Sequence, residues 1–81
     1  MSDFDAPLPP KSDPRWRKLV VGEIEYRSSR LATNMLLLDA TLAVRRDPSP
    51  RNVDRQLATV YTYFLTNRNE TARDLERIFA A

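Results

Sequence analysis

The sequence predicts an all-α protein, built as a long antiparallel helical hairpin with a short third helix at its C-terminal end. Apolar residues recur at intervals of three and four along most of the chain, which is the period of an amphipathic helix. Gly22 is the single glycine, so little interrupts this pattern. Four of the six prolines lie in the first 14 residues, and the other two, Pro48 and Pro50, mark one corner. These observations favour two long helices that meet at that corner.

Residues 1–12 are expected to form a disordered or extended tail. They lack helical periodicity and include the segment Ala-Pro-Leu-Pro-Pro, a composition typical of unpacked chain. Residues 13–81 are then expected to form one helical domain. At this length a single hydrophobic core is marginal, and a partner or a second copy commonly adds stability.

The first helix is expected over residues 14–46. Asp13 can accept hydrogen bonds from the free amides of the first turn, and Pro14 fits the first helical position, where no amide donor is needed. An apolar seam with the spacing of a lengthwise helix contact follows at Val21, Ile24, Leu31, Met35, Leu38 and Leu42. The segment 18–26 also shows a partial period of two, so a short strand there is the alternative.

The second helix is expected over residues 50–66 and the third over residues 69–80. The Asp-Pro and Ser-Pro steps at 47–50 separate the first two helices, because a residue before proline is steered away from the α region. Such a short connection makes the two helices antiparallel neighbours. The polar run Thr-Asn-Arg-Asn at 66–69 is interpreted as a turn or kink. The alternative is one uninterrupted helix from 50 to 80.

Four large apolar side chains stand in a row at 35–38. Successive helical residues point about 100° apart, so this run projects on nearly all sides of a helix. One neighbouring helix cannot cover it, and each exposed leucine would forgo roughly 1.5 to 3 kcal/mol of burial free energy. We therefore expect a second copy of the chain or a larger partner protein to complete the bundle. The predicted protein interface comprises Leu31, Met35, Leu36, Leu37, Leu38, Leu42, Tyr61, Tyr63 and Phe64.

Four arginines surround the proline corner: Arg45, Arg46, Arg51 and Arg55. Arg45 and Arg46 have a sufficient structural role at the end of a helix, where positive charge complements the helix dipole. Arg51 opposes the dipole of the next helix, which favours a functional role. Because guanidinium groups make bidentate contacts, the four arginines are predicted to bind an anion or an acidic partner segment.

Nothing in the sequence predicts an enzyme. The chain has no cysteine and no histidine, so the commonest metal ligand and the commonest general base are missing. One glycine leaves no phosphate-cradling loop. Asp39, at the end of the apolar run, is expected at the least covered edge or paired with Arg46 or Arg55. No cofactor, metal or small-molecule substrate is expected.

Charge and hydropathy bear on location and partners. The formal net charge is +2, with 13 basic residues interleaved among 11 acidic ones, which favours protein partners over nucleic acid. No apolar run approaches the roughly 20 residues that span a bilayer, and the acidic, proline-rich N-terminus does not resemble a secretory signal. The sequence therefore predicts a cytoplasmic protein without membrane contact.

The function expected from these features is that of a small non-catalytic adaptor, chaperone or accessory subunit that binds protein and self-associates. The stretch at 57–65 resembles the aromatic helix of flagellar export chaperones, small bundles that sheath the helical tail of an export substrate; this resemblance covers nine of 81 residues. The alternative is a helix-turn-helix-like DNA-binding regulator that uses the region 53–80. Glu70, Asp74 and Glu76 disfavour it, because carboxylates facing phosphates are costly.

Overall fold

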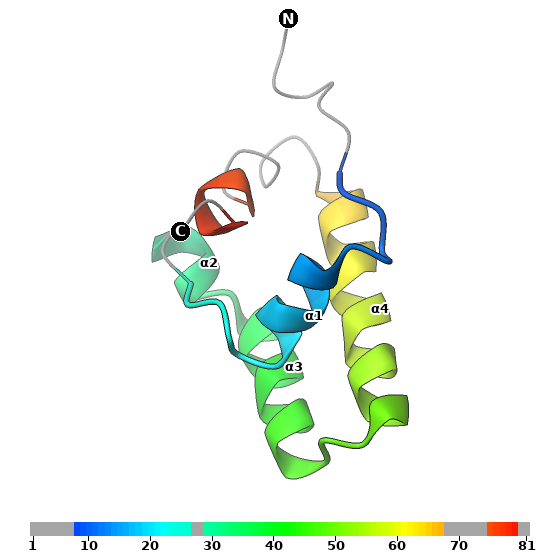
Figure 1. The fold of residues 1–81 in the computed structure, drawn as a ribbon. Coiled ribbons are helices and arrows are strands. Elements are labelled where there is room, and N and C mark those ends of the chain that lie inside the picture. The colour runs from blue at the N-terminus through cyan, green and yellow to red at the C-terminus, as the bar shows by residue number, and fades with distance from the viewer. Residues whose placement is uncertain (1–7, 27–28, 68–74, 80–81) are drawn as a thin grey trace, which may run out of the picture.

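A computed structural model describes residues 8–26, 29–67 and 75–79 of the chain. It contains the helices α1 (Pro14–Val20), α2 (Ser29–Ala32), α3 (Met35–Arg46) and α4 (Pro50–Thr66), shown in Figure 1. Residues 75–79 are also helical, and no strand occurs among the described residues. The predicted all-α class is therefore confirmed, and the strand considered for 18–26 is not formed.

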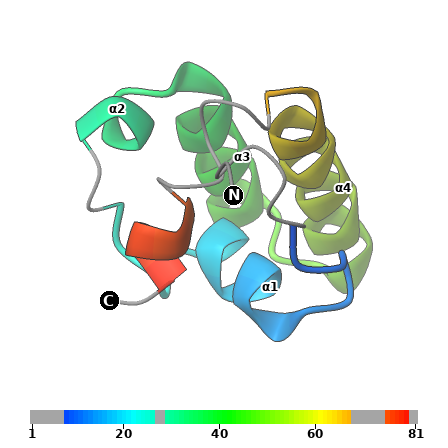
Figure 2. The same cartoon turned by 90° about the horizontal axis from the view of Figure 1, so that it is seen from above.

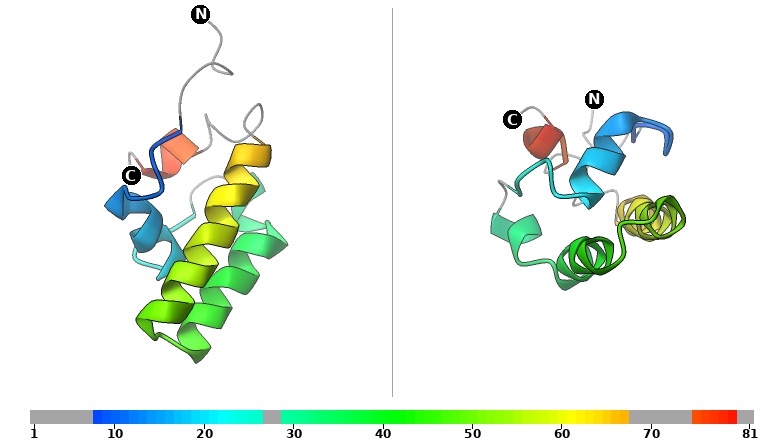
Figure 3. Two further views of the ribbon diagram at one scale, coloured as in Figure 1. Left: turned by 90° about the vertical axis from the view of Figure 1, so that its right-hand side faces the viewer. Right: turned by 60° about the horizontal axis from the view of Figure 1, so that its bottom comes forward.

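The longest two helices, α3 and α4, lie side by side and run antiparallel (Figure 3, left). α1 packs against both of them, and the helical segment 75–79 lies beside α1 (Figure 2). In no part of the chain that the structure describes does a helix combine the length and apolar character needed to cross a membrane.

The single helix expected over 14–46 is wrong, because α1 ends after two turns. Gly22 has a φ of +84°, a left-handed conformation that L side chains rarely adopt. The amide of Glu23 donates to the Lys18 carbonyl at 2.8 Å, and the Gly22 amide donates to the Leu19 carbonyl at 3.3 Å. This pair of hydrogen bonds is the Schellman motif, which satisfies the last carbonyls of a helix and turns the chain away from its axis. The apolar seam is thus divided between separate elements.

Asn34 starts α3 as a new helix. Its Oδ1 atom accepts from the Leu37 amide at 3.1 Å, and its Nδ2 atom donates to the Tyr63 hydroxyl on α4 at 2.7 Å. The same side chain therefore caps α3 and ties its first turn to the last part of α4. The expected stop at Arg46 agrees with the end of α3.

α4 has the bounds expected from the sequence. Its N-cap is Ser49, whose Oγ atom accepts from the Asn52 amide at 3.3 Å, and Pro50 occupies the first turn. It ends at Thr66, where the polar run begins, with Asn67 as its C-cap. The expected start of the third helix, at 69, lies outside the described residues.

Trp16 is the centre of the core and is fully buried. Its ring lies 5.3 Å from the rings of Tyr61 and Phe64 and 5.5 Å from the ring of Phe79, measured between centroids. The Trp16 side chain therefore joins α1 to α4 and to the helical segment 75–79. The buried apolar residues are Trp16, Leu19, Val20, Leu31, Leu37, Ala40, Val44, Val53, Val60, Phe64, Leu75 and Ile78.

Leu8 and Pro9 contact the domain, within the segment that the sequence predicts as a disordered or extended tail. Leu8 packs against the core, and the Pro9 carbonyl accepts a hydrogen bond from Trp16 Nε1 at 3.1 Å. A buried indole N–H needs an acceptor, and the chain before α1 supplies it. Residues 1–7 of the expected tail lie outside the described residues.

Candidate functional site

The apolar run at 35–38 is divided among three environments. Leu37 is buried in the core and is 1% exposed. Leu36 is half-buried and packs against the core on the side of α4. Met35 is 66% exposed and Leu38 is half-buried, and both line a groove on the outer side of α3. The fold therefore covers part of this run and leaves one face of α3 open.

The groove has a volume of about 480 Å³. One wall is α3, and the other is the chain between α1 and α2 together with Ala32 of α2. Met35 and Leu42 bring the largest exposed apolar surface to it, with exposed fractions of 66% and 45%. Its lining consists of Gly22, Ile24, Glu25, Tyr26, Ala32, Met35, Leu38, Asp39, Thr41, Leu42 and Arg45.

A short chain of hydrogen bonds fixes the loop wall of the groove to α3. The Thr41 hydroxyl donates to the Leu37 carbonyl at 2.9 Å. The Tyr26 hydroxyl lies 2.7 Å from Thr41 Oγ1 and 3.3 Å from the same Leu37 carbonyl, so the three groups form one hydrogen-bonded cluster. At Gly22, an added Cβ would lie 3.8 Å from Thr41 Cγ2, so the backbone of the loop also passes close to the helix. The groove is therefore held open by the fold itself.

Three charged side chains line the groove: Glu25, Asp39 and Arg45, all exposed. The ion pair seen among the described residues joins Asp13 to Arg15 at 2.9 Å, so Asp39 and Arg45 have no such partner there. Asp39 thus lies at the exposed edge, the first of its two expected placements. These carboxylate and guanidinium groups are available to a molecule that enters the groove.

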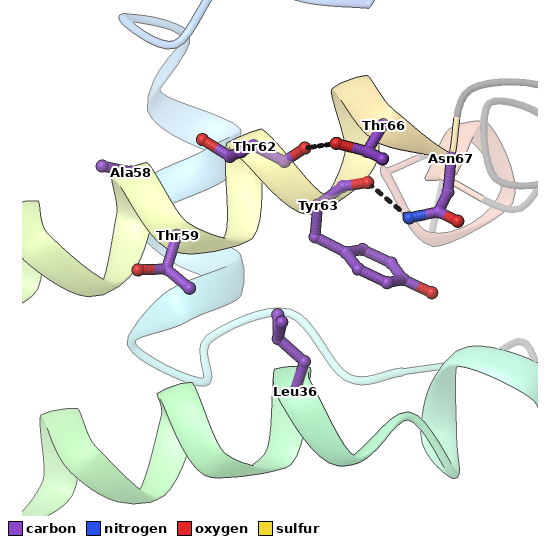
Figure 4. Close-up of a pocket in the computed structure, with 7 residues that line it drawn as sticks. All are labelled: Leu36, Ala58, Thr59, Thr62, Tyr63, Thr66 and Asn67. Carbon is purple, nitrogen blue, oxygen red and sulfur yellow. Dashed lines mark hydrogen bonds between the residues drawn. The ribbon is translucent and has the colours of Figure 1, made fainter.

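A second pocket, also about 480 Å³, opens between α3 and α4 (Figure 4). Leu36 and Tyr63 face it from the two helices. The Thr66 hydroxyl donates to the Thr62 carbonyl at 2.9 Å, and Asn67 Nδ2 donates to the Tyr63 carbonyl at 2.9 Å. Both of these hydrogen bonds are made to carbonyls of α4. The pocket is lined by Leu36, Ala58, Thr59, Thr62, Tyr63, Thr66 and Asn67.

The four arginines of the corner do not all line one cavity. Arg51 and Arg55 line a pocket of about 250 Å³ that also contains the carboxylate of Asp47, which offsets part of their charge. Arg45 lines the α3 groove, and Arg46 is exposed outside both cavities. The predicted anion site at these four arginines stays a prediction, and the pocket at Arg51 and Arg55 includes one carboxylate.

Asn52 is a structural residue that sequence reasoning missed. Its Nδ2 atom donates to the Ala43 carbonyl at 3.0 Å and to the Asp47 carbonyl at 2.8 Å. Both carbonyls lie at the C-terminal end of α3; that of Ala43 also accepts the Asp47 amide at 3.1 Å, and Asn52 joins this end of α3 to the first turn of α4. An asparagine in the first turn of a helix carries no signal for this contact, because the acceptors belong to the preceding helix.

The remaining residues of the predicted interface contribute to the domain's own packing. Leu31 and Phe64 are buried in the core. Tyr61 is half-buried beside Trp16, and Tyr63 is half-buried and bonded to Asn34. Of the predicted interface residues, Met35, Leu38 and Leu42 line the open groove.

The region 53–80, considered for DNA binding, is described only in part, because 68–74 lie outside the described residues. In its C-terminal portion Leu75 and Ile78 are buried, while Glu76 and Arg77 are exposed. The exposed side of 75–79 thus carries one acid beside one base. The DNA-binding alternative stays a prediction, which the salt dependence of duplex binding would test.

Within the described ranges, no cluster of three or more His, Cys, Asp or Glu side chains is placed to hold a metal ion. Comparisons with protein-family models, curated proteins and solved structures give no match. In the part of the chain that the structure describes, the domain is all-α, and an apolar face of α3 is left open in the groove.

Proposed function

We propose that this chain is a non-catalytic helical adaptor or accessory subunit of the cytoplasm, which binds protein through the α3 groove. One observation carries the proposal: Met35 and Leu42, on one face of α3, are 66% and 45% exposed. Covering each of them contributes about 1 to 2 kcal/mol, since part of each side chain is already buried. The absence of cysteine is in keeping with a reducing compartment.

The character of the groove favours a protein over a small molecule. Its apolar centre, formed by Met35, Leu38 and Leu42, is bordered by the charged side chains of Asp39 and Arg45. An apolar centre with a polar rim is the usual composition of a protein interface. The apolar residues follow the intervals of three and four by which one helix packs against another. An incoming helix would extend the pair α3 and α4 into a larger bundle.

The chain offers a matched pair of variants for the test. Leu42 in the groove is 45% exposed, and Leu65 on α4, outside the groove, is 44% exposed. Leu42→Asp and Leu65→Asp therefore remove similar apolar surface and add the same charge. Leu37→Asp cannot test the groove, because Leu37 is buried in the core and a carboxylate there would unfold the domain.

We expect both variants to keep the helical circular dichroism of the wild type. In extracts of the source cells, a tagged wild-type chain and Leu65→Asp should recover the same protein in a fixed ratio, whereas Leu42→Asp should lose it. If Leu42→Asp recovers that protein as well as Leu65→Asp does, the groove is not the binding surface.

A further inference from the structure

We infer that Met35 is an oxidation site, at which a peroxide converts the thioether to the sulfoxide and thereby weakens the binding of a protein partner in the α3 groove. The inference rests on the proposed function of the groove and names a modification that regulates it. It is carried by one exposed side chain. Met35 is 66% exposed and lies in the lining of the groove, on the open face of α3.

Among the described residues, Met35 is the side chain that a mild oxidant reaches first. The chain contains no cysteine, whose thiolate would react before a thioether. Trp16, the single tryptophan, is fully buried. The second methionine, Met1, lies outside the described residues. Oxidation of the described part of the chain is therefore concentrated at the groove.

The reaction is a transfer of one oxygen atom. The sulfur of Met35 attacks an oxygen of hydrogen peroxide, so that an S–O bond forms and the O–O bond breaks. The transferred oxygen gives its proton to the leaving hydroxide, which departs as water. The sulfur is oxidised by two electrons and the peroxide is reduced by two, and one peroxide is consumed for each sulfoxide.

The groove offers the sulfoxide no side-chain hydrogen-bond donor. Three lining side chains carry donors: Tyr26, Thr41 and Arg45. The two hydroxyls lie 2.7 Å apart, and they are 3.3 and 2.9 Å from the Leu37 carbonyl. Arg45 stands about 15 Å farther along the helix than Met35. An apolar partner surface would therefore bury the sulfoxide oxygen without a hydrogen bond, which opposes binding.

The same modification leaves the domain folded. Met35 occupies the first position of α3 and is not part of the apolar core. The hydrogen bonds that begin α3 use other groups: Asn34 Oδ1 accepts from the Leu37 amide, and the Asn34 carbonyl accepts from the Leu38 amide, both at 3.1 Å. Oxidation therefore changes the binding surface and preserves the fold. Methionine sulfoxide reductases reverse the reaction, so the change is reversible.

Peroxide treatment of the full chain tests the inference, with Met35→Leu as the matched control. Leucine has a similar volume, forms no sulfoxide and leaves Met1 in place. Mass spectrometry of proteolytic fragments should show the sulfoxide at Met35 in the treated wild type. Its helical circular dichroism and its urea midpoint should equal those of the untreated chain.

The probe for binding is the protein that the wild-type chain and Leu65→Asp recover from extracts of the source cells. Oxidised wild type should recover about tenfold less of it, because the apolar surface of Met35 is no longer available for burial. Oxidised Met35→Leu should recover as much as the untreated variant. In the complex, the partner covers Met35 and should slow its oxidation.

Two further results separate this effect from general oxidative damage. Methionine sulfoxide reductases with dithiothreitol should restore the recovery of the partner by oxidised wild type. Met35→Gln, which places a polar side chain of similar length there, should lower recovery without any oxidant.

A folded chain in which peroxide does not convert Met35 overturns the inference. So does an oxidised wild type that unfolds, that recovers the partner as before, or that loses it no more than oxidised Met35→Leu does. None of these results overturns the proposed function, which fails only if Leu42→Asp leaves recovery of the partner unchanged.

Discussion

The hydroxyl of Tyr26 lies 2.7 Å from the hydroxyl of Thr41, and this contact joins the loop after α1 to the middle of α3. The Thr41 hydroxyl also donates a hydrogen bond to the Leu37 carbonyl at 2.9 Å. The loop would otherwise be attached mainly through half-buried apolar side chains such as Ile24. The geometry of the groove therefore depends on one tyrosine outside any helix.

Tyr26→Phe should lower the free energy of unfolding by about 1 kcal/mol, the usual net contribution of one hydrogen bond. Thr41 keeps its bond to the Leu37 carbonyl, so no buried acceptor is left without a donor. Urea denaturation measures the loss. Tyr61→Phe is the control, because the Tyr61 hydroxyl makes no hydrogen bond with a described residue, and an equal loss there would contradict the role given to Tyr26.

Gly22 illustrates how far the sequence determined the fold. The helical class, the stop at Arg46 and the bounds of α4 could be predicted, because caps and prolines act locally. The end of α1 was missed, although the one glycine of the chain stands there, because the apolar spacing continues past it. The covered and open faces of α3 could not be predicted, since they depend on how α1 and α4 pack. The same apolar pattern predicted Met35, Leu42, Leu31 and Phe64 as interface residues, yet the first two are exposed and the last two are buried in the core.

Gly22→Ala should destabilise the domain by about 1 to 2 kcal/mol, because alanine disfavours a φ of +84°. The nearest atom to the new Cβ, Thr41 Cγ2, would be at 3.8 Å, an ordinary contact, so the cost is conformational. Gly22→Asn should cost less, since asparagine tolerates left-handed backbone. Thermal or urea unfolding of both variants checks the order, and an alanine variant as stable as the asparagine variant would show that the end of α1 does not need this conformation.

Asn52→Asp should destabilise the corner between α3 and α4 by about 1 to 3 kcal/mol. Asparagine donates to the carbonyls of Ala43 and Asp47, whereas an ionised carboxylate cannot donate and would face both oxygens. Helix electrostatics alone predict the opposite, because an acidic residue in the first turn of α4 complements the dipole. The sign of the change in urea denaturation decides between the two, and a stabilised variant would mean that the bridge to α3 contributes little.

Arg15 should control the titration of Asp13. Hydrogen bonds from the side chain and amide of Arg15 lower the pKa of the Asp13 carboxyl from 3.8 to about 2. Because the pKa is lower in the folded state, the ionised form stabilises the fold; this contribution is complete above pH 3.8 and is lost as pH falls through about 2.

Arg15→Ala removes the side-chain bonds and keeps the amide bond, so the pKa of Asp13 should rise part of the way toward 3.8. NMR titration of the Asp13 side-chain carboxyl carbon measures it. Arg17→Ala, an exposed position in the same helix, should leave the titration as it is in the wild type. An Arg15→Ala variant with an unchanged Asp13 pKa would show that the cap alone lowers it.

The proposed function depends on the open face of α3, and an NMR dilution series of the full chain tests that face most directly. If α3 is a self-complementary docking surface, amide and methyl resonances of Met35, Leu38 and Leu42, and of the loop residues at 22–26, should shift with concentration, while those of Leu65 should not. Shifts centred on α4 or on the Arg51 and Arg55 corner, or none anywhere over the range, would contradict the expectation that the chain self-associates through this face.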